Sequence, residues 1–298
     1  MRTVTKTIPV TPARLYYFNY DPITLLAEDL YEIKFSVYYY VGSTKTYLLS
    51  DQNTIKYKTG WYYPDWTPSS AITDGYYYLE WEYKETSTSS VVTFDAGRFV
   101  IESTVYDFVP YLSLYELKQS KYYATYFSTY SDLQLLPILK AGVEFIENYC
   151  ENKFYPYYKE YFYKELYEQT ILVEDIVSII SFEDEDGNDE SDYIDLCDGI
   201  LLGLQDLDEN LYEVYLNVVN GKCNNSGHSS ILEDVLIGYM LNNIDISSVS
   251  VGAITQEQTD RHMVKYSINN SNIINILGNT NLVAKLKTLK RLLKVAII

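Results

Sequence analysis

The chain of 298 residues has 47% hydrophobic residues, a mean hydropathy of −0.17 and a formal net charge of −18, from 41 acidic residues against 23 lysines and arginines. This composition is typical of a globular protein, and it excludes disordered and collagen-like chains. The acidic surplus disfavours broad, nonspecific binding to nucleic acid.

The length predicts two domains of ordinary size, each able to bury its own core. No apolar run approaches the roughly 18 residues of a membrane span, and the first residues lack the apolar core of a signal peptide. The three cysteines (Cys150, Cys197 and Cys223) lie far apart, which predicts reduced thiols and an intracellular or virion protein without membrane contact.

Tyrosine is unusually frequent, with 34 residues against 10 phenylalanines and 3 tryptophans. An A/T-rich coding sequence explains this frequency, because its codons favour tyrosine. Large interfaces explain it equally well, because tyrosine supplies contact area at low entropic cost. The two explanations are compatible.

Residues 1–104 predict an all-β domain. Apolar and polar residues alternate over residues 32–39 and again over 77–84, the period of a half-buried strand. Turn residues separate such runs, for example around Gly42 and at Asp74–Gly75. Several short strands at spacings of roughly 8–12 residues predict an antiparallel sandwich.

After residue 104 the pattern changes to helices with intervening strands. Capping boxes at Ser113 and Ser131 each open a helix, and the second helix carries one apolar stripe from Leu135 to Cys150. Strands are predicted over residues 171–182, 193–204 and 212–219, with a turn at residues 186–188. A third helix begins at Ser230, and the last begins near Asn281.

Two stretches resemble known phage proteins. The segment from Asp74 to Trp81, followed by a Ser/Thr hairpin and residues 98–101, resembles the closing strands of immunoglobulin-like domains in phage structural proteins. The order of elements over residues 105–298 resembles the head–tail connector (neck adaptor) family of tailed bacteriophages. The matching motifs are residues 112–118, 141–149, 173–179, 215–221 and 289–293.

The resemblance implies an N-terminal immunoglobulin-like β-sandwich (residues 1–104) and a mainly α-helical connector domain with a small antiparallel β element (residues 105–298). It implies a structural virion protein at the head–tail junction, assembled in the host cytoplasm. About twelve copies would form a homo-oligomeric ring that joins the portal protein to the adjacent neck or tail protein. Double-stranded DNA would pass through the channel without specific binding.

An acidic stretch lies between the predicted strands. Residues 183–198 hold nine acidic residues and no lysine or arginine. A solvated hairpin tip explains them. A calcium loop is an alternative, although the EF-hand pattern fails because Asp189 stands where glycine is required. The resemblance adds a third explanation, an acidic lumen that repels DNA phosphates. The acidic hairpin is Glu183, Asp184, Glu185, Asp186, Asp189 and Glu190.

Residues 285–298 form a basic tail with five cations and no acid. Cations in a last helical turn favour the helix dipole, which is the simplest explanation. The resemblance suggests that this tail docks on the portal, while a calmodulin-like or membrane-surface role is a further alternative. The predicted docking residues are Lys285, Lys287, Lys290, Arg291 and Lys294. The long polar segment 252–270 would line the channel, with Gln256, Arg261, His262 and Lys265 facing it.

No catalytic, cofactor or metal residues are predicted. The two histidines, His228 and His262, lie in polar segments, and Cys223 with His228 lacks a zinc spacing. No nucleophile elbow, phosphate loop or dinucleotide fingerprint occurs. Carboxylate pairs for glycoside hydrolysis are present in any chain this acidic, but none is singled out by an apolar setting. The alternative to the ring function is a baseplate or fibre-attachment module that binds host carbohydrate through the tyrosine-rich residues 16–83.

Overall fold

A computed structural model of the chain describes residues 2–164, 176–191, 195–197, 200–202, 213–221, 230–247, 258–259, 262–263 and 280–291. The chain forms two compact units and crosses between them near residues 110, 152 and 229. The β unit comprises the described parts of residues 1–109 and 152–228. The helical unit comprises those of residues 110–151 and 229–295.

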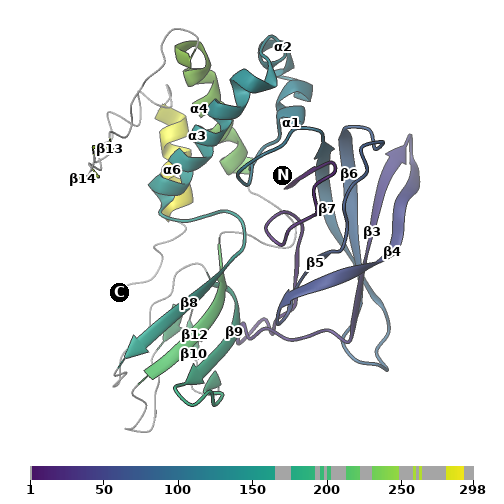
Figure 1. The fold of residues 1–298 in the computed structure, drawn as a ribbon, viewed down its shortest axis with the longest axis vertical. Coiled ribbons are helices and arrows are strands. Elements are labelled where there is room, and N and C mark those ends of the chain that lie inside the picture. Colours follow the sequence, from purple (N-terminus) through teal and green to yellow (C-terminus); the bar gives the residue numbers. More distant parts are fainter. Residues whose placement is uncertain are drawn as a thin grey trace. The chain divides into compact units, whose positions relative to one another are not determined.

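A seven-stranded sheet dominates the β unit (Figure 1). Its order is β1-β7-β6-β3-β4-β5-β2, and every pairing is antiparallel except the parallel pair β1–β7. The strands are β1 (Arg2–Thr5), β2 (Tyr17–Phe18), β3 (Glu32–Val41), β4 (Thr44–Lys58), β5 (Trp61–Pro64), β6 (Gly75–Lys84) and β7 (Val92–Glu102).

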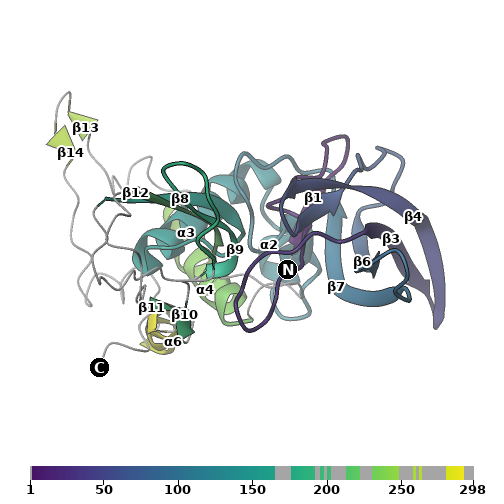
Figure 2. The ribbon, with the colours of Figure 1, turned by 90° about the horizontal axis from the view of Figure 1, so that it is seen from below.

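The sheet curls because β4 is long and its pairing is irregular. Over its first part the 15-residue strand pairs with β3, and over its last part it pairs with β5. Register shifts interrupt both pairings, and such bulges bend and twist a strand. The segments after β1 and β5 then meet, since the Thr7 amide donates to the Pro68 carbonyl at 2.8 Å and the Val10 amide to that of Trp66 at 2.9 Å. Figure 2 shows the curved strands.

The concave side of this sheet holds the core. The predicted alternation in β3 and β6 is confirmed, since Phe35, Val37, Leu79 and Trp81 are buried with Phe99 of β7. The prediction of an immunoglobulin-like sandwich is wrong, because one continuous sheet curls around this core in place of two stacked sheets. The register shifts that allow the curl leave no mark in the alternation of residues.

A three-stranded antiparallel sheet completes the β unit, in the order β8-β12-β9. Its strands are β8 (Tyr157–Lys164), β9 (Ile176–Asp184) and β12 (Glu213–Asn220). Residues 25–27 pair with the edge of β9: the Ile179 amide donates to the Leu25 carbonyl at 2.8 Å, and the Ala27 amide donates to the Ile179 carbonyl at 2.6 Å.

An apolar cluster lies beside this pairing. Tyr16, Phe18 and Trp61 from the seven-stranded sheet and its flanks pack with Val219 of β12, and all four are buried. The two sheets therefore share part of one core. Two small hairpins are also described, β10 (Asp195–Cys197) with β11 (Ile200–Leu202) and β13 (Gln258–Thr259) with β14 (His262–Met263).

The helical unit contains α1 (Leu114–Gln119), α2 (Ala124–Phe127), α3 (Asp132–Cys150), α4 (Ser230–Ser247) and α6 (Thr280–Arg291). The predicted capping box at Ser113 is confirmed: its hydroxyl accepts from the Glu116 amide at 2.9 Å, and the Glu116 carboxylate accepts from the Ser113 amide at 3.0 Å. At the start of α3, Gln134 accepts from the Ser131 amide at 2.9 Å.

The prediction of a mainly α-helical C-terminal domain is wrong. The four predicted helices are present as α1, α3, α4 and α6, but α1 is short, the four-residue α2 was not predicted, and the chain between α3 and α4 contributes strands to the β unit. Strand β8 was not predicted, because tyrosines on both of its faces hide the alternation. Among the described helices, none is long and apolar enough to cross a membrane.

Two glycines allow close helix packing. A Cβ atom on Gly142 of α3 would lie 2.7 Å from Leu236 Cδ1 and 2.9 Å from Tyr239 Cδ1 of α4. A Cβ atom on Gly238 of α4 would lie 2.0 Å from Leu282 Cδ1 of α6. Each crossing is thus closer than any larger residue permits.

We predict that Gly142→Ala destabilises the helical unit. Overpacking against Leu236 and Tyr239 costs about 1–3 kcal/mol, of which alanine's higher helix propensity returns about 1 kcal/mol. Thermal unfolding followed by circular dichroism measures the difference. Asn148→Ala, at an exposed position of the same helix, is the control and leaves the melting temperature unchanged or slightly raised. A Gly142→Ala variant as stable as the wild type contradicts the close crossing.

Candidate functional site

The acidic hairpin predicted from sequence is a tight turn at the end of β9. Its residues Glu185, Asp186 and Asp189 are exposed, whereas Glu183, Asp184 and Glu190 are partly covered. The Gly187 amide donates to the Asp184 carbonyl at 3.1 Å, and φ at Gly187 is +81°, a conformation that favours glycine. The turn predicted at residues 186–188 is confirmed.

The Asp184 side chain organises this turn. Its carboxylate accepts from the amides of Asp186 at 2.9 Å and Asn188 at 2.8 Å, and from the Asn188 side chain at 2.8 Å. These hydrogen bonds, the one from the Asn188 side chain foremost, lower the pKa of Asp184 below its usual range. Burial raises the pKa of Glu190, and the charges of Asp184 and Asp189 add to that rise.

Some carboxylates of the acidic hairpin therefore accept hydrogen bonds within the hairpin itself, while others face solvent. Asp189 accepts from both the amide and the hydroxyl of Ser191. Within the described part of the chain, no group of three or more His, Cys, Asp or Glu side chains is arranged to hold a metal ion.

The predicted docking cations are placed in part. Lys285, Lys287, Lys290 and Arg291 belong to α6, and Lys294 lies outside the described residues. Lys285 forms an ion pair with Asp234 of α4, with Nζ 2.5 Å from the carboxylate. This partly exposed ion pair links α6 to α4 within the helical unit, and Lys287 of the same helix is partly exposed.

The predicted channel loop is only partly visible. Gln256, Arg261 and Lys265 lie outside the described residues, and His228 and Cys223 do too. The backbone of His262 belongs to the small hairpin, where it pairs with Thr259. Cys150 is buried in α3.

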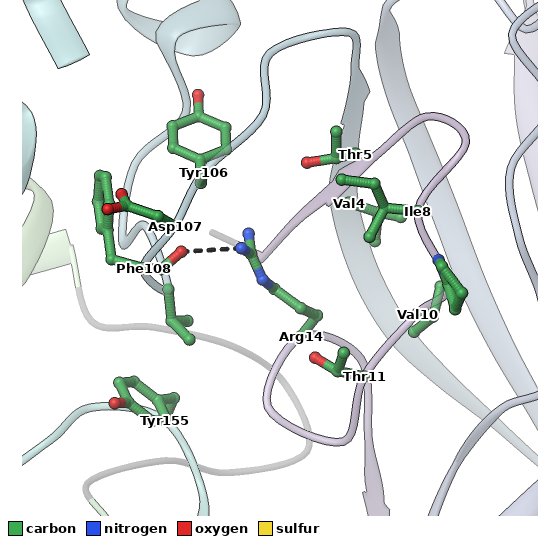
Figure 3. A pocket seen from close by; sticks show the side chains of 12 residues that line it. Val4, Thr5, Ile8, Val10, Thr11, Arg14, Tyr106, Asp107, Phe108 and Tyr155 are labelled. Carbon is green, nitrogen blue, oxygen red and sulfur yellow. Dashed lines mark hydrogen bonds between the residues drawn. The ribbon is translucent and has the colours of Figure 1, made fainter.

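A cavity of about 400 Å³ lies beside the N-terminal segment (Figure 3). Apolar side chains dominate its lining, among them Val10, Phe108 and Tyr155. Arg14 projects into this space and donates from Nη2 to the Phe108 carbonyl at 2.8 Å and from Nη1 to the Thr3 carbonyl at 3.2 Å. It thereby ties the segment after β1 to the segment after β7.

The charge of Arg14 is compensated nearby. Burial lowers the pKa of the Arg14 guanidinium, and Tyr106 and Glu102 oppose this effect. Glu102 is itself buried and accepts from the Tyr106 hydroxyl at 2.6 Å, and the Arg14 guanidinium lies 5.9 Å from the centre of the Tyr106 ring. The two hydrogen bonds from Arg14 to main-chain carbonyls make the arrangement a structural clamp.

Arg14 was not predicted as a site residue from the sequence. The only signal was its position immediately before the apolar run Leu15–Phe18, where a buried arginine needs main-chain acceptors. A comparison with protein-family models and with curated proteins finds no match to this chain.

We predict that Asp184→Asn loosens the acidic hairpin at neutral pH. Because hydrogen bonding depresses the pKa of folded Asp184, its contribution is present above the unfolded pKa of about 3.9 and is lost as the pH falls through the folded value. Hydrogen exchange of residues 184–190, corrected for intrinsic rates, should show less protection in the variant at pH 7 and a smaller pH dependence. Asp186→Asn removes an equal charge and is the control. Equal protection in all three proteins contradicts this role of Asp184.

We predict that Arg14→Met destabilises the β unit by roughly 1–3 kcal/mol, because the carbonyls of Thr3 and Phe108 lose their donors. Urea unfolding monitored by intrinsic fluorescence measures the change. Arg14→Lys keeps the charge but presents a compact ammonium in place of the planar fork, so its loss should be smaller. An unchanged unfolding midpoint for Arg14→Met would show that Arg14 is not a clamp.

Proposed function

We propose that this protein is a structural subunit of a tailed-bacteriophage virion that forms a homo-oligomeric ring of about twelve copies in the neck. The ring joins the portal protein to the next neck or tail protein, and double-stranded DNA passes through its channel.

The observation that carries the proposal is the order and position of the elements after residue 110. Helices α1, α3 and α6 and strands β9 and β12 overlap the segments whose motifs resemble the connector family, and helix α4 lies between β12 and α6 in the order that the resemblance implies. The capping box of α1 and the stripe of α3 have the local geometry that those motifs predict.

The charge distribution supports the same role. Residues 105–284 hold 29 acidic and 9 basic residues, and the exposed carboxylates of the acidic hairpin belong to this surplus. Like charges repel, so an acidic wall would let DNA slide through a channel without binding to it.

The basic end of the chain supports docking on an acidic partner. In α6, Lys285 is used within the helical unit by its ion pair with Asp234. The docking role therefore falls on Lys287, Lys290 and Arg291, with Lys294 beyond them.

The attachment-module alternative requires a test that keeps the β unit intact. Residues 16–61 share a buried cluster with β12, and residues 25–27 pair with β9. Deleting residues 1–104 would expose that cluster and remove the partner of β9, so loss of activity in the truncated chain would not identify a binding site. Point variants on exposed side chains avoid this.

We predict that changing Lys287, Lys290 and Arg291 to Glu abolishes attachment to portal rings without unfolding the protein, because the ion pair of Lys285 is untouched. Co-sedimentation with purified portal rings measures attachment, and circular dichroism checks the fold. Added salt should weaken the wild-type attachment if the contact is exposed, since screening shortens the reach of charges to about 10 Å at 0.1 M. Normal attachment of the folded triple variant rules out docking by these cations.

A further inference from the structure

A row of side chains crosses four strands on the convex face of the seven-stranded sheet. The pairing register places Arg98 of β7 opposite Tyr78 of β6, Tyr78 opposite Tyr38 of β3, and Tyr38 opposite Tyr47 of β4. The neighbouring positions Val37 and Leu79 point into the core, so this row faces outward. We call Tyr38, Tyr40, Tyr47 and Tyr78 the tyrosine ladder.

In the tyrosine ladder, the rings of Tyr38 and Tyr78 stack on each other, and the more exposed rings of Tyr40 and Tyr47 pack against them. Tyr38 and Tyr78 stack with centroids 5.2 Å apart and planes 14° apart, and Tyr38 is 2% exposed. Tyr40 stands edge-on to both, at 5.2 Å from Tyr78 and 5.7 Å from Tyr38. Tyr47 lies 5.9 Å from Tyr38, and Tyr40 and Tyr47 are 49% and 47% exposed.

Charged groups hold the tyrosine ladder in place. Lys45 Nζ lies 4.1 Å from the Tyr38 ring centre and 4.7 Å from that of Tyr47, and it bonds to Glu80 at 2.7 Å. Glu80 also accepts from the Tyr47 hydroxyl at 3.2 Å.

A second carboxylate lies on the other side. Asp95 accepts from the Tyr38 hydroxyl at 3.1 Å, and Arg98 stacks over Tyr76 at 4.3 Å. Two cations and two carboxylates thus accompany the ladder, and their formal charges cancel. The face is locally neutral in a chain with a net charge of −18.

Sheet stability explains the buried part of the ladder, because cross-strand aromatic pairs stabilise a sheet. It does not explain why two more aromatic rings gather on the outside with half of their surface in water. Single exposed aromatics are ordinary, whereas a cluster of them marks a binding surface.

We propose that the tyrosine ladder, with the exposed carboxylate of Asp95, binds a neutral glycan. The exposed rings of Tyr40 and Tyr47 offer flat apolar area to the C–H faces of sugar rings. The exposed Asp95 carboxylate has further lone pairs for sugar hydroxyls, and the tyrosine hydroxyls both donate and accept.

The local charges favour an uncharged ligand. An acidic ligand meets the repulsion of a strongly acidic protein, and a basic one competes with Lys45 for the Glu80 carboxylate. The surface consists of aromatic and charged side chains, and aliphatic side chains do not take part in it. This inference does not depend on the ring function.

Affinity electrophoresis of the full chain tests the proposal, using native gels that contain dextran, mannan, β-1,3-glucan or galactan. We expect at least one polysaccharide to retard the wild-type protein. In the Tyr40→Ala/Tyr47→Ala double variant the apparent affinity should fall about tenfold or more, because two stacking rings are lost. Tyr40→Phe/Tyr47→Phe keeps the rings and should retain most of the retardation.

Tyr57→Ala is the matched control, because Tyr57 lies on the same strand β4 and is 44% exposed. It should be retarded like the wild type. Circular dichroism establishes that each variant is folded. No retardation by any of the four polysaccharides overturns the proposal, and so does equal retardation of the folded double-alanine variant. If the wild type binds no glycan and the double-alanine variant loses binding to another protein, the tyrosine ladder is a protein-binding surface and the proposal is also overturned. None of these outcomes bears on attachment to the portal.

Discussion

The pairing of residues 25–27 with the edge of β9 is the contact on which the arrangement of the β unit depends. It joins two sheets that are separated in sequence by the whole of α1, α2 and α3. Beside it, Trp61 packs with Tyr16, Phe18 and Val219 in a buried cluster. Burial of large aromatic side chains is the main source of stability in such a contact. The chain therefore contributes strands from two distant segments to one unit, while its helices form the other.

The same division assigns different tasks to the two units in the proposed function. The helical unit is held by close crossings at Gly142 and Gly238 and by the ion pair of Lys285 with Asp234. It carries the basic helix that is proposed to dock on the portal. The β unit presents the acidic hairpin at the end of β9 and the tyrosine ladder on its curled sheet. An assembly contact and a ligand contact can thus use separate surfaces, with separate effects of mutation.

Local features of this fold could be predicted from the sequence, and long-range ones could not. The alternation that buries Phe35 and Trp81, the capping box at Ser113 and the turn at Gly187 are decided by neighbouring residues. The curl of the sheet and the pairing at Ile179 depend on distant contacts. At the candidate sites the acidic residues were visible in sequence, but the role of Asp184 as acceptor for its own turn was not. Arg14 was missed because its acceptors are main-chain carbonyls, which no residue type reveals.

Antibody labelling of intact particles tests the proposed position of the protein in the virion most directly. The antibody should recognise an exposed epitope within residues 1–104, such as the loop around Ile23, a residue that is 82% exposed. We expect label at the head–tail junction in electron micrographs. Label at the tail tip would contradict the ring function and favour an attachment module. Absence of label from particles whose head–tail junction and tail tip are both accessible to the antibody would rule out both virion roles.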